Sequence, residues 1–348
     1  MSKPVVYFVP ITLNDGEDKI NLAVEKMLNA FTLEQKFSFK KDVPIKVSFG
    51  ERGNKTFIPQ SLMLGAIDFL KKKKIKSVFI ETNVLYRGER TNKKSHIALA
   101  KSHGFNALPV VIADGDIGED FERVEINKKH FKTCMIAKNL AKAPQVFVIS
   151  HFKGHMLAGF GGAIKQLAMG FASRGGKLAQ HVNSIPTINF LTCKKCWICV
   201  DKCPVHAISK GRISARIDKN KCIGCAACIA NCPYGVIKIN WLKGLTSSFH
   251  ERLVEYAYAA QLNKNNVYLT YALNMTKGCD CEGKKMNPAS DDLGIFLSTD
   301  PVACDKAIFD LLKERDKKVA FSDKNTFSYA KKIGFGSLDY KLKKLKFS

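Results

Sequence analysis

Short apolar runs alternate along most of the chain with stretches in which apolar residues recur every three or four positions. The short runs predict β-strands and the periodic stretches predict helices, because each period places apolar side chains on one face. In residues 18–31, for example, Ile20, Val24, Met27 and Leu28 share one helical face. Strands are predicted at 5–9, 45–49, 77–81, 110–113, 122–126, 145–150 and 267–272, and helices at 18–31, 59–70, 91–101, 249–262 and 301–313. This alternation predicts an α/β domain with a mostly parallel sheet.

The periodic pattern is interrupted in the middle of the chain. Residues 154–176 include seven glycines in 23 positions, and a cysteine-rich stretch follows at 188–240. Because helical and strand patterns resume afterwards, we divide the chain into a first part of the α/β domain (1–187), an inserted domain (188–240) and a C-terminal part that completes the α/β domain (241–348). Two consecutive domains joined by the cysteine-rich stretch are the alternative.

Eight of the 12 cysteines lie in this insert, in two copies of one pattern. Each copy reads Cys-x2-Cys-x2-Cys-x3-Cys-Pro, and the second copy follows the first by 29 positions. This is the spacing of bacterial two-cluster ferredoxins, in which the fourth cysteine of each run binds the other [4Fe–4S] cluster. The expected ligands are Cys193, Cys196, Cys199 and Cys232 for one cluster, and Cys222, Cys225, Cys228 and Cys203 for the other. Zinc knuckles fit less well, because structural zinc sites take four ligands in pairs. The insert is therefore expected to be a ferredoxin-like α+β domain.

Composition narrows the class of protein. No apolar run approaches the roughly 18 residues of a membrane-spanning helix, and the first run, 5–9, is too short for the core of a signal peptide. We therefore expect neither a membrane span nor secretion. Clustered cysteines in a large chain of this kind indicate metal ligation in a reducing compartment, so the expected location is the cytoplasm.

The formal net charge of +25 comes mostly from lysine. We do not expect nucleic acid as a partner, because no RNA-binding aromatic motif, zinc-finger spacing or arginine stripe accompanies the lysines. Lysines scattered over the surface are the simplest interpretation. The alternative is electrostatic steering, since surface charge raises association rates. The expected partner is then an acidic redox protein of the ferredoxin or flavodoxin type, and the sequence does not define an oligomeric state.

A second group of functional residue types follows the strand predicted at 145–150. His151 and His155 come directly after this strand, and parallel sheets bind ligands at the carboxyl ends of their strands. Glycines then allow backbone amides to approach a bound group, and the helix expected from about residue 163 would attract an anion at its N-terminus. The candidate cofactor-binding residues are Gly159, Gly161 and Gly162, with Thr82 and Asn83 after another predicted strand. A tightly packed glycine-rich helix with structural histidines is the alternative.

Several motifs resemble a family of uncharacterised iron–sulfur centre proteins, whose domain of unknown function contains an inserted two-cluster ferredoxin domain. The motifs are 82–86 (TNVLY), 103–105 (HGF), 151–155 (HFKGH), 159–165 (GFGGAIK), 169–173 (MGFAS), 176–177 (GK), 279–281 (CDC) and 298–303 (STDPVA). The resemblance covers nearly the whole chain. It implies the same two-part architecture and identifies no reaction.

A more distant resemblance is to the nickel-pincer lactate racemase superfamily. In that superfamily a catalytic histidine, a cofactor-bearing lysine and a metal-ligating histidine are separated by 10 and then 16 residues, as His155, Lys165 and His181 are here. The resemblance implies acid/base chemistry at His155, a ligand anchor at Lys165 and a metal ligand at His181, with His96 as a second acid/base. The racemase has no ferredoxin insertion, so a shared site position is implied more than shared chemistry.

Four further cysteines lie outside the insert. Cys279 and Cys281 form a close pair that predicts either a redox dithiol or soft metal ligands, and two incidental loop cysteines are the alternative. Cys134 and Cys304 stand alone and are predicted to be buried in the core. Asp300, directly before Pro301, is predicted to cap a helix.

Together these features predict an iron–sulfur protein that passes single electrons through two [4Fe–4S] clusters to a site in the α/β domain. The predicted catalytic residues are His155, Lys165 and His151, and the sequence leaves open whether this site also binds a further metal or a nucleotide-like cofactor. An oxidoreductase of unidentified substrate is the first hypothesis. A non-enzymatic electron carrier or partner-binding module is the second, and a structural or sensing role for the clusters is the third. Convergent histidine, lysine and cysteine side chains in a pocket facing the insert would favour the enzyme.

Overall fold

The structure is a computed structural model that describes residues 3–86, 88–181, 185–224, 227–239, 248–316 and 318–347. Its centre is an eight-stranded sheet, in which five of the seven strand pairings are parallel. In spatial order the strands are β16 (Lys341–Lys344), β1 (Val5–Val9), β15 (Gly294–Ser298), β14 (Val267–Ala272), β7 (Phe147–His151), β2 (Ile45–Lys46), β3 (Phe79–Glu81) and β4 (Val110–Ile112). The predicted α/β fold with a mostly parallel sheet is confirmed.

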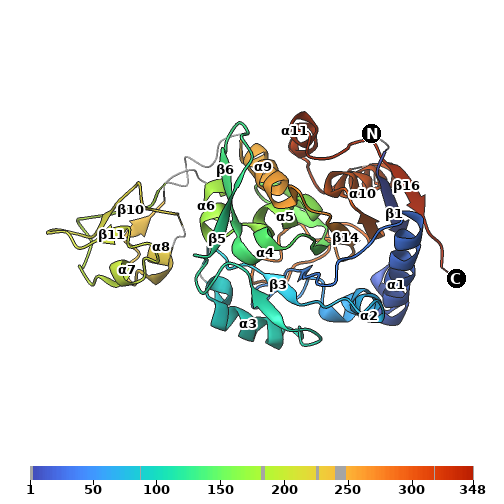
Figure 1. The fold of residues 1–348 in the computed structure, drawn as a ribbon, viewed down its shortest axis with the longest axis horizontal. Coiled ribbons are helices and arrows are strands. Elements are labelled where there is room, and N and C mark those ends of the chain that lie inside the picture. The colour runs from blue at the N-terminus through green and yellow to red at the C-terminus, as the bar shows by residue number, and fades with distance from the viewer. Residues whose placement is uncertain are drawn as a thin grey trace.

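Helices cover both faces of this sheet (Figure 1). The α/β part contains α1 (Glu17–Glu34), α2 (Leu64–Lys72), α3 (Lys93–Ser102), α4 (Lys138–Lys142), α5 (Ala163–Phe171), α6 (Arg174–His181), α9 (Phe249–Gln261), α10 (Pro301–Arg315) and α11 (Thr326–Lys332). Short 3₁₀ helices lie at Leu13–Asp15, Gln60–Met63 and Glu89–Thr91. None of the helices in the described ranges combines the length and apolar character that a transmembrane span requires.

Alternation along the strands explains why both faces are covered. In β1, Val6 and Phe8 pack into the core formed with α5, α9 and α10, whereas Tyr7 and Val9 pack into the core formed with α1 and α2. Successive side chains of a strand point to opposite faces, so an entirely apolar strand needs a helical layer on each side.

Two predicted local features are confirmed in the core. The Asp300 carboxylate accepts hydrogen bonds from the amides of Val302 and Ala303, at 2.8 and 2.9 Å, and so caps α10. Cys134 and Cys304 are fully buried.

Some elements differ from the prediction. The strand predicted at 122–126 is β5 (Phe121–Glu125), which pairs with β6 (Thr133–Ala137) in a separate antiparallel hairpin. A second small hairpin joins β8 (Lys153–His155) to β9 (Gly159–Gly161). β15 joins the main sheet antiparallel to β14, and the loop between these strands carries Cys279 and Cys281.

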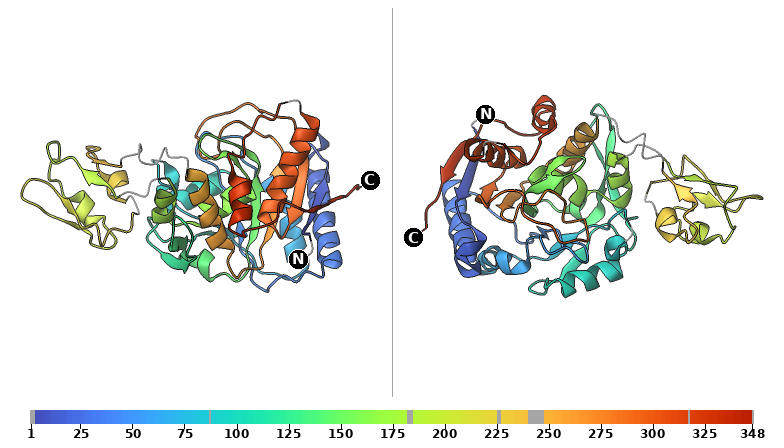
Figure 2. Two further views of the ribbon diagram at one scale, coloured as in Figure 1. Left: turned by 90° about the horizontal axis from the view of Figure 1, so that it is seen from above. Right: turned by 180° about the vertical axis from the view of Figure 1, so that it is seen from behind.

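The cysteine-rich insert forms a small lobe at one end of the molecule (Figures 1 and 2). It has a core of its own around Cys199, Cys203, Cys228 and Cys232. Its elements are β10 (Thr187–Ile188) paired with β13 (Ile237–Lys238), β11 (Ile208–Ser209) paired with β12 (Arg216–Ile217), and the helices α7 (Ile198–Asp201) and α8 (Ala227–Asn231).

Candidate functional site

A cavity of about 240 Å³ lies at the carboxyl edge of the parallel strands. It is called the large cavity because it is larger than the two cysteine-lined cavities of the insert. Segments that follow β2, β3, β7 and β14 reach the cavity, together with side chains of α5 and α6. Its polar lining consists of Ser48, Glu81, Thr82, Tyr86, Arg90, Lys153, His155, Lys165, Gln166, Lys177, His181, Cys279, Asp280 and Cys281. Parallel strands end at a common edge, so polar residues that are distant in sequence meet there.

A thiol pair beside a lysine occupies one wall of the cavity. Lys165 Nζ lies 3.4 Å from Cys279 Sγ. A hydrogen bond from Cys281 and the charges of Lys165 and Lys153 hold the pKa of Cys279 well below its usual value, although burial opposes this. The same hydrogen bond, together with burial, raises the pKa of Cys281. Cys279 therefore carries the negative charge of the pair and Cys281 keeps its proton.

Asp280, between the two cysteines, holds their loop in place. Its buried carboxylate accepts hydrogen bonds from His151 Nδ1 at 3.0 Å and from Lys153 Nζ at 2.5 Å. His151 Nε2 is bonded to the Leu273 carbonyl at 2.9 Å. Both ring nitrogens of His151 are thus engaged, and His151 does not line the cavity. It is a positioning residue for Asp280, which corrects the catalytic role predicted for it.

The other two predicted histidines do face the cavity. Burial, with the charge of Lys165 close by, lowers the pKa of His155 and lowers that of His181 to about 4. His155 Nδ1 accepts a hydrogen bond from the Ala158 amide at 3.0 Å. Both imidazoles are therefore neutral at neutral pH, and because Nδ1 of His155 accepts the Ala158 amide, the ring proton of His155 is on Nε2.

A lysine that the sequence analysis did not single out as a site residue faces the same cavity. Burial lowers the pKa of Lys177 to about 8. Its ammonium group donates to two neutral acceptors, the Thr82 hydroxyl at 2.5 Å and the Ala172 carbonyl at 2.7 Å. Glu81, at the end of β3, has its own cation, because Lys46 Nζ lies 2.6 Å from it. The charges of Asp114 and Glu81 act on Lys177, but the groups that accept its hydrogen bonds are neutral, so its ammonium group is a candidate for binding an anion in the cavity.

The anion site predicted at the start of the glycine-rich helix is wrong. The amides of Ala163 and Ile164, at the N-terminus of α5, donate to the buried carboxylate of Asp305 at 2.8 and 2.9 Å. None of the predicted glycines lines the cavity. Gly159 and Gly161 belong to β9, and a Cβ on Gly162 would lie 2.3 Å from Asp305 Oδ1. Close packing therefore requires the glycine at 162, and a side chain of α10 already occupies the amides that an anion would need.

Two further candidates lie near the cavity but do not line it. The backbone and side-chain amides of Asn83 both donate to Asp114 Oδ1, at 2.9 and 3.0 Å. His96 is completely buried on α3, with its ring edge-on to Phe49. Neither ring nitrogen of His96 has a hydrogen-bond partner among the described residues.

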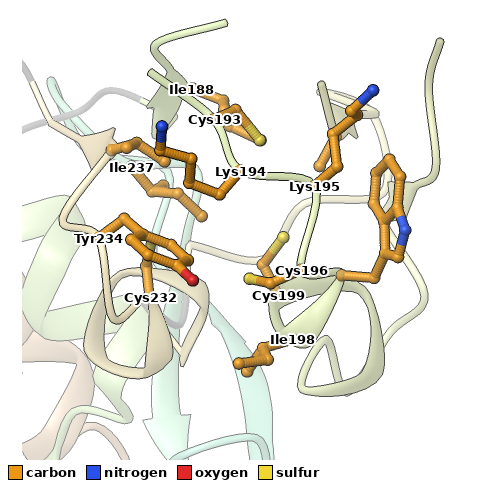
Figure 3. Close-up of a pocket in the computed structure, with 13 residues that line it drawn as sticks. Ile188, Cys193, Lys194, Lys195, Cys196, Ile198, Cys199, Cys232, Tyr234 and Ile237 are labelled. Atoms are coloured by element: carbon orange, nitrogen blue, oxygen red, sulfur yellow. The ribbon is translucent and has the colours of Figure 1, made fainter. Parts of the chain in front are cut away.

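In the insert, the structure brings together the four cysteines predicted for the first cluster. Cys193, Cys196, Cys199 and Cys232 line one cavity, shown in Figure 3, and Cys232 reaches it from the second run. Apolar side chains, including Ile188, Ile198 and Ile237, complete the wall (Figure 3). Four thiols around one apolar cavity fit the donor set of an iron–sulfur cluster.

The second run shows the reciprocal arrangement. Cys222 and Cys228 line another cavity together with Cys203, which comes from the first run. Cys225, the fourth predicted ligand, lies outside the described residues. The Ala207 amide donates to Cys203 Sγ at 3.2 Å, and amide donors of this kind stabilise the negative charge of ligand sulfurs.

The cavity lined by Cys203, Cys222 and Cys228 lies on the side of the insert that contacts the α/β part. A Cβ on Gly175, in α6, would lie 2.3 Å from the Ile223 carbonyl, and Leu178 packs against Gly224. Leu178 also forms a small apolar cluster with Ile239 of the insert. The same helix presents Lys177 and His181 to the large cavity, so α6 links the second cysteine set to it.

His181, Cys279 and Cys281 were predicted as ligands of a further metal. All three line the large cavity. In the described ranges, however, no three His, Cys, Asp or Glu side chains converge on a point that a single metal ion could occupy. The structure brings these residues to one cavity without assembling a ligand set.

The comparison with known families assigns the chain to a family. A family profile described as "Domain of unknown function (DUF362)" matches residues 43–310. The chain belongs to this family. The predicted resemblance is thereby confirmed, and the family description identifies no reaction.

Individual relatives of this DUF362 chain are iron–sulfur proteins by name. It is 29% identical over 126 residues to the probable iron–sulfur subunit of the Frd operon of Proteus vulgaris, which covers 35% of this chain and 69% of that protein. It is 34% identical over 67 residues to "Ferredoxin 7Fe" of Hydrogenibacillus schlegelii, covering 19% and 72%. Among solved structures, the lactate racemase apoprotein of Thermoanaerobacterium thermosaccharolyticum matches with 13% identity and a TM-score of 0.44, covering 89% of this chain and 57% of the racemase.

Proposed function

We propose that this protein is an iron–sulfur oxidoreductase that reduces or oxidises a small anionic substrate in the large cavity. The observation that carries the proposal is the combination of two interleaved cysteine sets with a cavity that holds a lysine-stabilised thiol pair. An electron carrier that only docks a partner would not need convergent lysine, histidine and cysteine side chains in its second domain. Similarity to a ferredoxin and to an iron–sulfur protein of the Frd operon supports the iron–sulfur part of the proposal.

The cysteine sets define where clusters would be held. Cys193, Cys196, Cys199 and Cys232 would hold one [4Fe–4S] cluster, and Cys203, Cys222 and Cys228, with Cys225, the other. Bound there, each cluster would supply one-electron transfer. The Ala207 amide and the apolar walls would stabilise and shield the ligand sulfurs.

The contact with α6 gives the two sets different roles. The second set packs through Ile223 and Gly224 against Gly175 and Leu178, next to the large cavity. In the first set Cys196 is exposed. We therefore assign entry of electrons to the first set and exit toward the cavity to the second.

An acidic electron donor fits the exposed side of the insert. Residues 188–240 contain nine lysines and arginines against two aspartates. Phe190, Leu191 and Tyr234 are exposed close in sequence to Cys193 and Cys232, and Figure 3 shows Tyr234 beside the first cysteine set. A basic surface around an apolar centre would steer and then bind an acidic partner protein.

Within the cavity, the chain's own residues divide the work. Lys177 attracts the anionic group of the substrate. Arg90 also lines the cavity, but its guanidinium is already paired with Glu51 and lies 4.0 Å from Glu81. The neutral imidazoles of His155 and His181 face the substrate and hydrogen-bond it without adding charge to the cavity. A volume of about 240 Å³ limits the substrate to a small molecule.

The test combines metal analysis with anion binding. Protein purified without oxygen is expected to contain about eight iron and eight sulfide per chain, as two [4Fe–4S] clusters require. A screen of small carboxylates and phosphates should find an anion that raises the melting temperature of the wild type and not of Lys177→Met. The matched control is Lys202→Met, which removes an exposed lysine of the insert. Iron without any such anion would favour the electron carrier, and zinc in place of iron would refute both.

A further inference from the structure

We infer that Cys279 and Cys281 form a reversible disulfide, so that the cavity contains a two-electron redox pair of its own. The inference deepens the proposed function and rests on it, because the electrons for this pair are those that the insert delivers. It assigns a role to two cysteines that no cluster uses.

The loop geometry places the two sulfurs within bonding reach. The Glu282 amide donates to the Cys279 carbonyl at 2.8 Å, which closes a turn over residues 279–282. The Glu282 carboxylate in turn accepts a hydrogen bond from the Cys279 amide at 3.1 Å. Alternate positions of such a turn bring their Cα atoms to about 5–6 Å, within the range that disulfides span. Both cysteines line the same cavity, and each shifts the pKa of the other.

The surroundings of the pair favour redox chemistry over a structural role. His151 and Lys153 donate hydrogen bonds to the Asp280 carboxylate, and the Asp280 backbone carbonyl accepts a hydrogen bond from the Glu51 amide at 3.1 Å. These bonds hold the backbone of the loop, while both cysteines still line the cavity. Lys165 Nζ lies 3.4 Å from Cys279 Sγ, and its charge also acts on Cys281. A cation beside one sulfur makes that cysteine the better leaving group and stabilises the reduced form of a pair.

The reaction balances in electrons and protons. In reduction the S–S bond breaks, the pair takes up two electrons, Cys281 sulfur takes up one proton, and Cys279 sulfur remains a thiolate beside Lys165. The electrons would come one at a time from a low-potential electron-donor protein, and clusters held by the two cysteine sets of the insert would supply this one-electron transfer. In oxidation the S–S bond forms again, and two electrons and one proton pass to the anionic substrate. The pair thus converts one-electron delivery into a two-electron reaction.

The chain contains internal controls for this role. Cys134 and Cys304 are completely buried and do not line the cavity. Their nearest polar contacts are the Glu255 carbonyl at 4.0 Å and the Thr270 hydroxyl at 3.5 Å. Neither of them has a second thiol to pair with in these contacts, so both should stay reduced when Cys279 and Cys281 are oxidised.

The first experiment measures the thiols of the full-length holoprotein. The protein is equilibrated without oxygen in glutathione buffers of increasing oxidised fraction, quenched in acid, alkylated after unfolding, and digested for mass spectrometry. The peptide with Cys279 and Cys281 is expected to carry two labels or none, with one midpoint, while Cys134 stays labelled throughout. Cys281→Ser is expected to convert the response to a mixed disulfide with glutathione at Cys279. Two labels in every buffer, or a mixed disulfide in the wild type, would overturn the inference.

Lys165→Met tests the charge. Removal of this positive charge should shift the thiol–disulfide equilibrium of the pair toward the disulfide by about tenfold or more, since one unit of thiol pKa corresponds to a factor of ten. Lys128→Met, which removes another half-buried lysine, should leave the midpoint unchanged. An unchanged midpoint in Lys165→Met would show that the lysine does not stabilise the reduced pair.

A second experiment separates this inference from the proposed function. Reduced ferredoxin is expected to convert the disulfide of the wild type to two thiols, with two equivalents consumed. In Cys203→Ala and Cys228→Ala the disulfide should persist with ferredoxin and yet respond to dithiothreitol. Absence of iron in the wild type would refute the proposed function while the glutathione equilibrium stayed measurable. Full iron content with two permanently free thiols would refute this inference alone.

Discussion

The buried contact between Asp280 and Lys153 offers the sharpest test of how the cavity is held together. Both residues are almost inaccessible, at 1% and 8% exposure, and their charged atoms lie 2.5 Å apart. Asp280→Asn keeps the shape of the side chain and removes its charge, which leaves Lys153 without its carboxylate. Breaking a buried pair from one side costs about 3–5 kcal/mol, and the adjoining cavity favours the lower end because water can reach Lys153.

The expected shift in melting temperature follows from the size of the domain. The α/β part has roughly 290 residues, which at ~2.1 cal/mol/K per residue corresponds to an unfolding entropy of about 0.6 kcal/mol/K. A loss of about 3 kcal/mol therefore lowers the melting temperature by about 5 °C, measurable by calorimetry. Asp68→Asn is the control, because Asp68 and Lys71 are exposed and 4.0 Å apart, and such pairs contribute roughly 0–1 kcal/mol.

The pH dependence and a double variant test the same reasoning. Burial opposes ionisation of Asp280, but Lys153 and His151 hold its pKa well below its usual value. A lowered pKa contributes stability above the unfolded value of about 4 and loses it as the pH falls further, so the difference from wild type should stay constant from pH 8 to 5 and shrink below pH 4. Lys153→Met with Asp280→Asn should cost less than the two single changes added. A loss no larger than in Asp68→Asn, or full additivity, would refute this account of the loop.

Three further predictions follow from single contacts. Gly162→Ala would place a methyl group 2.3 Å from Asp305 Oδ1 and should cost about 1–3 kcal/mol in calorimetry. Gly161→Ala should cost less, because its nearest neighbour would be the flexible Lys165 side chain at 3.2 Å, and equal losses would contradict the packing role of Gly162. Iodoacetamide should label Cys279 of the wild type at nearly equal rates at pH 7 and pH 9. In Lys165→Met, labelling at pH 7 should be about tenfold slower, because loss of the cation raises the thiol pKa. The same ratio of rates in both proteins would refute the assignment of a thiolate to Cys279. The pKa of His181 is lowered to about 4, so the free energy of unfolding should fall by up to about 3 kcal/mol as the pH drops from 6.5 toward 4. His181→Asn should flatten this pH profile. An unchanged profile would show that the imidazole is not buried in its neutral form.

Local patterns were sufficient for the elements and for the cysteine sets. The apolar periods predicted β1, β7, β14, α1, α9 and α10 close to their observed bounds, because period and burial are linked within one element. The ferredoxin spacing predicted which cysteines share a cavity, including the crossing of Cys203 and Cys232, because a short motif largely determines its own geometry. No comparable apolar pattern predicted β15, which joins the main sheet antiparallel to β14, or β6, which pairs with β5 in a separate hairpin.

The sequence by itself determined that this chain is an α/β protein with an interleaved cysteine insert, since both depend on spacings of a few residues. Only the tertiary structure decided the chemistry of the cavity. Lys165 meets Cys279 across 114 positions, and Asp305 of α10 occupies the amides that the glycine-rich segment was expected to offer an anion. His151, next to His155 in the motif, turns instead to Asp280. Such partners are selected by how strands and helices pack, and packing joins residues whose distance along the chain carries no periodic signal.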